Sequence, residues 1–314
     1  MIKNLKCVKD SNEVIHLICL DINLQDINNQ ITGLFKGELT KIRKEELHCC
    51  PHCGSKTYIK YGNYKNVQRY KCKNEECKKT FSLATNSLWE YSKKDLNTWM
   101  SFVRLMFEKR SLRYISQKLE ISLSTAFYWR HKVMKALMKD DEKELVKKYV
   151  HIITTRMREN FKGCRKIATR RRKLIWIVTA KDINDKIISS PICKSRWDDR
   201  AFRKKIYSKI DKKAYLRAYP NRFIYAIAKK HNRSVGNKKD IIDNVILTFR
   251  ARFANWFSDF RGIATKYLKD YLTWFKLFYK RKVYNLSTIV KVVIKKISYI
   301  KTNDIGKKDF CEEI

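Results

Sequence analysis

The spacing of hydrophobic residues changes along the chain and divides it into different parts. Between residues 58 and 70, aromatic residues alternate with lysine among turn-forming residues, which predicts short β-strands. In the segment 92–138, hydrophobic residues recur every three or four positions, which predicts helices. From residue 149 onward, strand and helix patterns alternate, as is typical of an α/β domain.

The segment 92–138 should form three helices in succession. Ser92 suits the N-cap of the first helix, with Asp95 three residues later. The second helix begins near Leu112, and Ser122 or Ser124 can cap the third. The residues expected to face the core of the first helix are Leu96, Trp99, Met100, Val103, Leu105, Met106 and Phe107.

The α/β part should contain strands at 150–154, 174–179, 187–193 and 214–218. An Asp182–Asn184–Asp185 turn should join the second strand to the third. Helices are expected from Asp198, capped by it or by Ser195, and at 222–231, 239–256 and 263–280.

These patterns predict an α+β multi-domain protein. The expected parts are an N-terminal segment 1–46 of unassigned role, a ribbon-like module 47–90, a helical module 91–140, an α/β core 141–282 and a basic tail 283–314.

The charge balance narrows the function. The chain carries 71 lysine and arginine residues against 31 acidic residues, a net charge of +40. Such an excess indicates a polyanionic partner, and double-stranded DNA is the expected one. A membrane is disfavoured because the apolar stretch 289–300 is interrupted by Lys291, Lys295 and Lys296. Glu13 and His16 interrupt the only apolar run near the N-terminus, so we expect no signal peptide and a cytoplasmic location.

Two cysteine pairs have the spacing of a metal site. Cys50 and Cys53 flank Pro51-His52, and Cys72 and Cys77 are separated by four residues. In a reducing compartment, two such pairs predict a closed Cys₄ zinc site with a structural rather than catalytic role. Cys49 could replace Cys50, and His48 and His52 are further donors.

Residues 112–132 fit a helix, a short turn and a second helix, which is the form of a DNA-binding helix-turn-helix. Phe127 and Trp129 should pack on the preceding helices, and Glu120 stands where such turns often carry glycine. An ordinary helical hairpin with solvated basic residues is the alternative. The predicted DNA-contacting residues are Ser124, Thr125, Tyr128, Arg130 and Lys132.

Several short strings together resemble one family. C-P-H-C-G-S (50–55), Q-R-Y-K-C (68–72), K-K-T-F-S (78–82) and I-S-L-S-T-A-F-Y-W-R-H-K (121–132) resemble bacterial insertion-sequence transposases with an N-terminal zinc ribbon. F-K-G (161–163) and G-I-A-T-K-Y-L-K-D-Y-L-T-W-F (262–275) are similar to the core of that family. The resemblance implies a ribonuclease-H-like α/β core in which a DDE acid set holds two Mg²⁺ ions.

The acids that the resemblance implies are replaced in this chain. Ile153 stands at the first acidic position and Tyr219 at the second, while Asp243 or Asn244 is what remains near the third. Isoleucine cannot bind a hard cation, so the core is expected to be degenerate and to need Mg²⁺ only if it is active.

The hypothesis is therefore a transposase-family protein that binds the terminal repeats of an insertion sequence, as a homo-oligomer, without catalysis. The basic segment 156–173 would contact DNA phosphates, or would simply be a solvated charge run. Two alternatives stay open: an active transposase with relocated acids, and a sequence-specific transcription regulator.

Overall fold

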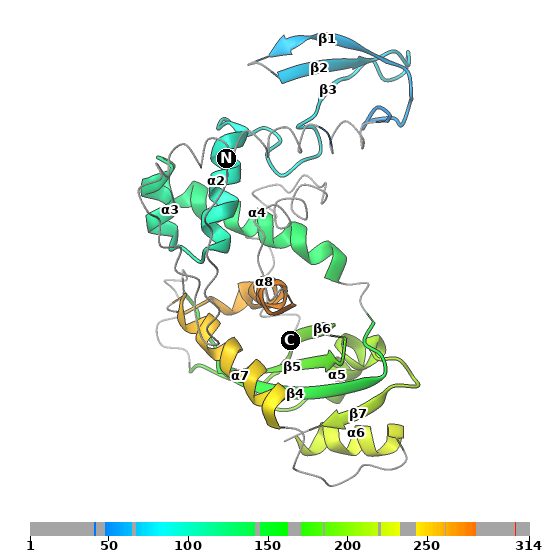
Figure 1. Ribbon diagram of the computed structural model, residues 1–314, viewed down its shortest axis with the longest axis vertical. Coiled ribbons are helices and arrows are strands. Elements are labelled where there is room, and N and C mark those ends of the chain that lie inside the picture. The colour runs from blue at the N-terminus through cyan, green and yellow to red at the C-terminus, as the bar shows by residue number, and fades with distance from the viewer. Residues whose placement is uncertain are drawn as a thin grey trace, which may run out of the picture.

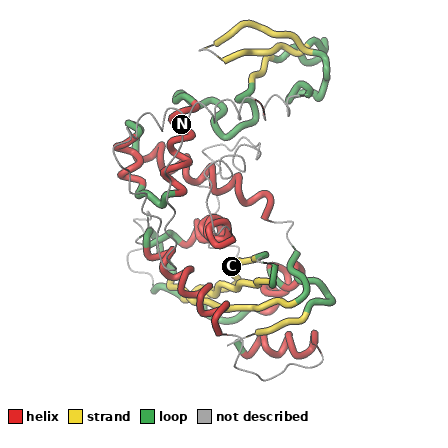
Figure 2. Tube along the Cα trace, viewed as in Figure 1, coloured by secondary structure: helices red, strands yellow, loops and turns green. Residues whose placement is uncertain are grey.

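The computed structural model describes residues 41, 48–64, 67–141, 145–162, 171–184, 186–218, 221–232, 243–260, 262–280 and 305. The protein is a mixed α/β molecule with one sheet at each end and helices between them (Figures 1 and 2). Apart from Lys41 and Ile305, the segments 1–46 and 283–314 lie outside the described residues, as do residues 163–170 of the basic segment 156–173.

The small sheet is antiparallel and contains β1 (Tyr58–Tyr64), β2 (Val67–Cys72) and β3 (Thr80–Ser82). The strands predicted between residues 58 and 70 are confirmed. A bulge interrupts the pairing of β1 with β2, and it includes Gly62 at φ +64, a conformation that glycine adopts without strain. The rings of Tyr58, Tyr70 and Phe81 pack together on one side of this sheet, with centroids 5.3 to 5.6 Å apart.

Three helices follow: α2 (Leu96–Phe107), α3 (Leu112–Lys118) and α4 (Leu123–Asp141). The predicted Ser92 cap is wrong, because the Asp95 side chain accepts the hydrogen bond from the Thr98 amide. Ser92 instead accepts a 2.9 Å hydrogen bond from the Trp99 indole nitrogen. Ser122, and not Ser124, caps α4 by accepting from the Thr125 amide.

The large sheet has the order β6-β5-β4-β7. Its strands are β4 (Tyr149–Arg158), β5 (Leu174–Asp182), β6 (Ile187–Lys194) and β7 (Tyr215–Ala218). β4, β5 and β6 form an antiparallel meander, and β7 lies parallel to β4. Asp182 closes the β5–β6 turn as predicted, since its carboxylate accepts from the Asn184 and Lys186 amides.

Helices cover both faces of this sheet. One face packs against α5 (Asp199–Lys205) and α6 (Arg222–Asn232). Of the two predicted caps of α5, Asp198 and not Ser195 caps the helix. The other face packs against α7 (Asp243–Ser258) and α8 (Leu268–Lys280), and this core continues into α2 and α4. The helix predicted from residue 263 begins only at Leu268, because Ala264 is extended and a 3₁₀ turn, Thr265–Tyr267, precedes the helix.

Candidate metal centre and nucleic-acid interface

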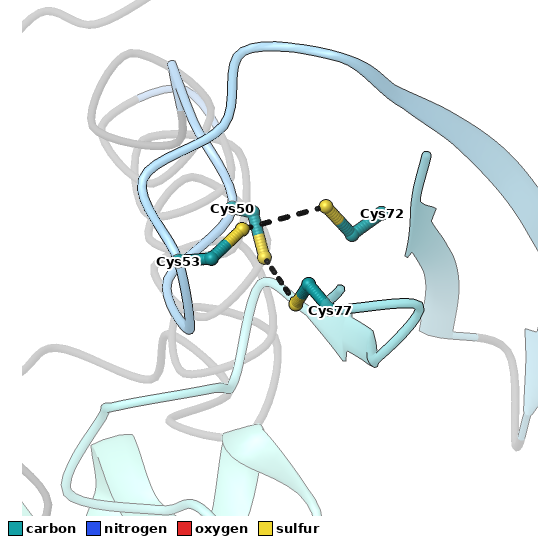
Figure 3. A group of neighbouring side chains, drawn as sticks. All are labelled: Cys50, Cys53, Cys72 and Cys77. Carbon is teal, nitrogen blue, oxygen red and sulfur yellow. Dashed lines mark hydrogen bonds between the residues drawn. The ribbon is translucent and has the colours of Figure 1, made fainter. Parts of the chain in front are cut away.

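Four cysteine thiols converge beside the small sheet, as Figure 3 shows. The Sγ atoms of Cys50, Cys53, Cys72 and Cys77 all lie within 4.8 Å of one another. Cys50 Sγ is 3.8 Å from Cys77 Sγ, and Cys53 Sγ is 3.6 Å from Cys72 Sγ. A tetrahedral site with Zn–S bonds of about 2.3 Å has sulfur atoms about 3.8 Å apart, so this cluster has the dimensions of a zinc site.

Two tight turns present the thiols. In the first turn, Gly54 donates to the Cys50 carbonyl at 2.8 Å, and Gly54 itself has φ +76. In the second, the amides of Cys77 and Lys78 both donate to the Asn74 carbonyl. Each turn therefore aims two thiols toward the same point, which is how a zinc knuckle presents its ligands.

The surroundings of the thiols shift their pKa values in different directions. A hydrogen bond from the Ser55 backbone lowers the pKa of Cys53 to about 7, while burial raises the pKa of Cys72 to about 11. A bound cation favours the thiolate form of every ligand, so metal binding would release protons from this cluster.

The structure brings Cys50, and not Cys49, into the cluster. Cys50 is buried and belongs to the cluster, whereas Cys49 lies outside it and is half-buried. His48 and His52 are exposed and also lie outside the group. Within the described parts of the chain, these four cysteines are the one group of three or more potential metal ligands.

Four of the five predicted DNA-contacting residues lie along one side of α4. Ser124 and Tyr128 are exposed, and Thr125 and Lys132 are half-buried beside them. Lys135 extends the same side by one turn and was missed, although its spacing of seven residues from Tyr128 indicates it. This side of α4 therefore offers hydroxyl, phenol and ammonium groups together.

Arg130 contradicts the prediction. Its side chain is buried, with 3% of its surface exposed, because α4 places it opposite Tyr128. The guanidinium donates to the Arg110 carbonyl at 2.8 Å and lies over the rings of Phe260 and Trp274. Arg130 thus joins α4 to the connection between α2 and α3 and to α8, and it faces away from the side that carries Ser124.

The turn before α4 is held in a defined shape. Glu120 adopts φ +49, so a glutamate takes the left-handed conformation that glycine often supplies in such turns. The Ser122 hydroxyl contacts the hydroxyls of Ser124 and Thr125 at 2.9 and 2.8 Å. An open pocket of about 450 Å³ lies beside them, lined by Thr125, Lys132 and residues 90–94 among others.

The inner side of α4 packs against the α/β part. Trp129 stacks on Trp99 of α2 with ring centroids 3.8 Å apart, as its predicted packing role requires. His131 is fully buried between Phe127 and Tyr267, and its Nδ1 lies 3.6 Å from an Asp270 carboxylate oxygen. Burial lowers the pKa of His131, and Asp270 opposes that shift.

Ile153 lies in the middle of β4, where the resemblance places an acid. It pairs with Thr179 of β5, and only 1% of its surface is exposed. Its side chain belongs to the apolar core formed with α7 and α8. Tyr219 and the side chains of Asp243 and Asn244 lie outside the described residues.

The neighbouring row of the sheet is basic. His151 of β4 pairs with Lys181 of β5 on one side and with Arg217 of β7 on the other. Residues that pair directly across strands point to the same face, and His151 shares its face with Ile153 two residues later. Burial, then the charges of Arg217 and Lys181, lower the pKa of His151.

The acidic residues of the core have other partners. Glu159 is buried and contacts Lys194 at 3.2 Å while accepting from the Lys173 amide. The acids whose side chains the structure describes serve caps, turns or ion pairs, and they are Glu159, Asp182, Asp198, Asp199, Asp211, Asp259 and Asp270. Asp185, Asp240 and the side chain of Asp243 lie outside the described residues.

Comparisons with known proteins give a partial match. No protein-family model matches the chain. A region of 103 residues is 30% identical to an "Uncharacterized protein in transposable element ISH50" of Halobacterium salinarum, covering 32% of this chain and 33% of the relative. The chain therefore matches about a third of that relative's length.

A chain in the crystal structure of a pre-cleavage Mos1 transpososome is similar over 64% of this protein and 80% of its own length, with 12% identity and a TM-score of 0.27. We draw no fold assignment from a TM-score of that size. Among the described helices, none combines the length and apolar character needed to cross a bilayer.

Proposed function

We propose that the protein binds double-stranded DNA at the ends of a mobile element and takes part in transposition without catalysing strand transfer. The observation that carries DNA binding is the polar side of α4, where Ser124, Tyr128 and Lys132 are arranged on a helix that follows a tight turn. The 30% sequence identity over 103 residues with a protein of a transposable element supports the link to transposition.

The small sheet and its cysteines would form a zinc ribbon, with Zn²⁺ held by Cys50, Cys53, Cys72 and Cys77. The ribbon would be structural, since four protein ligands leave no open position for substrate. The Sγ–Sγ separations of 3.8 and 3.6 Å within the cysteine cluster fit this ion.

The large sheet would be a degenerate ribonuclease-H-like core. Its three-stranded meander, with a fourth strand parallel to the first, supports that assignment. Catalysis by such a core needs clustered carboxylates to hold Mg²⁺. Here Ile153 is apolar and buried. The adjacent row places Lys181 and Arg217 on either side of His151, and the positive charges of the lysine and the arginine oppose a divalent cation.

The test uses the zinc-loaded full chain and duplexes that carry the terminal repeats of the element, with scrambled duplexes as the reference. We expect tighter binding to the terminal duplex, and loss of that preference in Tyr128→Ala. Incubation with Mg²⁺ or Mn²⁺ should give no cleavage. Equal binding to both duplexes would refute end recognition, footprints confined to promoter sites would favour a regulator, and metal-dependent cleavage would refute inactivity.

A further inference from the structure

The small sheet has one covered side and one exposed side. Its covered side holds Tyr58, Tyr70 and Phe81 against the cysteines. Strand pairing places a second set of side chains on the opposite side, which we name the outer face: Ile59, Tyr61, Tyr64, Val67, Arg69 and Lys71. The outer face needs an explanation because it gathers several large side chains that remain in solvent.

The large side chains of the outer face are exposed to solvent. Tyr61 and Tyr64 are 48% and 62% exposed, and Ile59 and Val67 are also exposed. Contiguous exposed apolar side chains commonly mark an interaction site. In Figure 1 the small sheet lies at the end of the molecule away from the large sheet, and β1 is its outermost strand.

The outer face is also basic. The Lys71 ammonium lies 5.2 Å from the centre of the Tyr61 ring, and Arg69 donates to the Thr80 hydroxyl at 2.8 Å beside it. The sequences of β1, β2 and β3 contain no acidic residue. The segment 48–83 carries eight lysine and arginine residues and two glutamates, so it stays basic even with the charge of about −2 that a zinc tetrathiolate adds.

We propose that the outer face of the small sheet binds the sugar–phosphate backbone of duplex DNA, as a second contact beside α4. This inference rests on the proposed DNA-binding function and adds a second site to it. Lys71 and Arg69 neutralise phosphates, tyrosine hydroxyls donate to phosphate oxygens, and Ile59 and Val67 pack on sugars. The contact is independent of base sequence, whereas α4 supplies the sequence preference.

The test compares two faces of the same sheet in the zinc-loaded full chain. The double variant Tyr61→Phe with Lys71→Ala removes one hydroxyl and one charge from the outer face without removing a ring. The matched control is Lys60→Ala, because Lys60 lies on β1 and pairs with Tyr70, whose ring belongs to the covered side. Zinc content and circular dichroism establish that each variant is folded.

Binding is measured by fluorescence anisotropy on terminal and scrambled duplexes at several salt concentrations. Losing one phosphate contact should weaken binding about tenfold near 0.1 M salt and reduce the salt slope by about 1. We expect this loss for the double variant on both duplexes, with their affinity ratio unchanged, and a smaller loss for Lys60→Ala.

Wild-type affinity and salt slope in the folded double variant would overturn the proposal, as would an equal loss in Lys60→Ala. A change in sedimentation without a change in DNA affinity would identify the outer face as a contact between protein copies and would also overturn it. Failure of the proposed function looks different, because it would remove the preference for the terminal duplex already in the wild-type protein.

Discussion

His151 of β4 and Lys181 of β5 are direct cross-strand partners, and the pair lies two residues from the pair of Ile153 and Thr179. Lys181 is buried and donates to the Tyr279 hydroxyl at 3.3 Å. An apolar side chain and a basic row thus occupy the part of the sheet where the family resemblance expects metal-binding acids. The apolar and basic character of this part of the sheet therefore involves both residue pairs and not Ile153 alone.

This arrangement predicts that restoring one acid is insufficient. In Ile153→Asp, the new carboxylate is buried among apolar residues next to basic side chains, and it lacks partner carboxylates. We expect no metal-dependent DNA cleavage and a loss of about 2 to 4 kcal/mol in the free energy of unfolding. Urea denaturation measures the second effect. Unchanged stability would show that the position is open to solvent, contrary to its burial.

The zinc ligands can be tested by a pair of neighbouring cysteines. Cys50→Ser should lose bound zinc and unfold the ribbon, because a structural zinc contributes on the order of 10 kcal/mol. Cys49→Ser should retain the metal, since Cys49 lies outside the cluster. Zinc released by thiol modification and limited proteolysis measure these outcomes. Zinc loss in Cys49→Ser with retention in Cys50→Ser would reverse the assignment.

Two basic residues of α4 are expected to have different roles: Lys132 contacts DNA, whereas Arg130 packs inside the protein. Lys132→Ala should reduce the salt slope of DNA binding by about 1 while leaving stability nearly unchanged. Arg130→Met should lower the free energy of unfolding by about 1 to 3 kcal/mol, because it removes the bond to the Arg110 carbonyl. Its salt slope should match the wild type. A reduced slope for folded Arg130→Met would return Arg130 to the DNA interface.

His131 makes stability depend on pH. Burial lowers its pKa, with Asp270 opposing the shift and Arg130 and Lys135 adding to it. As the pH falls, the unfolded chain therefore binds the proton before the folded chain does. The contribution of His131 to the free energy of unfolding is thus complete above the ordinary histidine pKa of about 6.5, and it is lost as the pH falls from there toward the lower pKa of the folded state. His151 shifts in the same direction. Urea midpoints should fall on acidification, and less so in His131→Gln; an equal fall in both proteins would contradict this role.

Turns and helix caps could be predicted from the sequence where hydrogen bonds between neighbouring residues determine the local structure. The Asp182 turn, the Asp198 cap and the cysteine knuckles are examples, because neighbouring residues alone satisfy their hydrogen bonds. Arg130 was misplaced because its charge suggested solvent, whereas helical rotation turns it toward α8 and Phe260. Such long-range partners, like the row of Arg217, His151 and Lys181, depend on strand register and are not visible in local patterns.

The cap of α2 was also mispredicted, because the sequence offers both Ser92 and Asp95 for it. Both residues can cap a helix, but Asp95 caps α2 whereas the Ser92 hydroxyl accepts from the Trp99 indole, one of the side chains of α2 itself. The outer face of the ribbon was equally hidden, because alternation predicts strands without saying which side another element will cover.

The central claim is that the α/β core does not hold divalent cations although the protein binds DNA. Titrating Mn²⁺ into the zinc-loaded full chain on duplex DNA, with free Mn²⁺ followed by electron paramagnetic resonance, tests it most directly. We expect free Mn²⁺ to equal or exceed that of a DNA-only control at every concentration, because the bound protein displaces cations from the DNA phosphates. Stoichiometric uptake of Mn²⁺ by the protein, abolished by replacing a core acid such as Glu159 with glutamine, would contradict the claim.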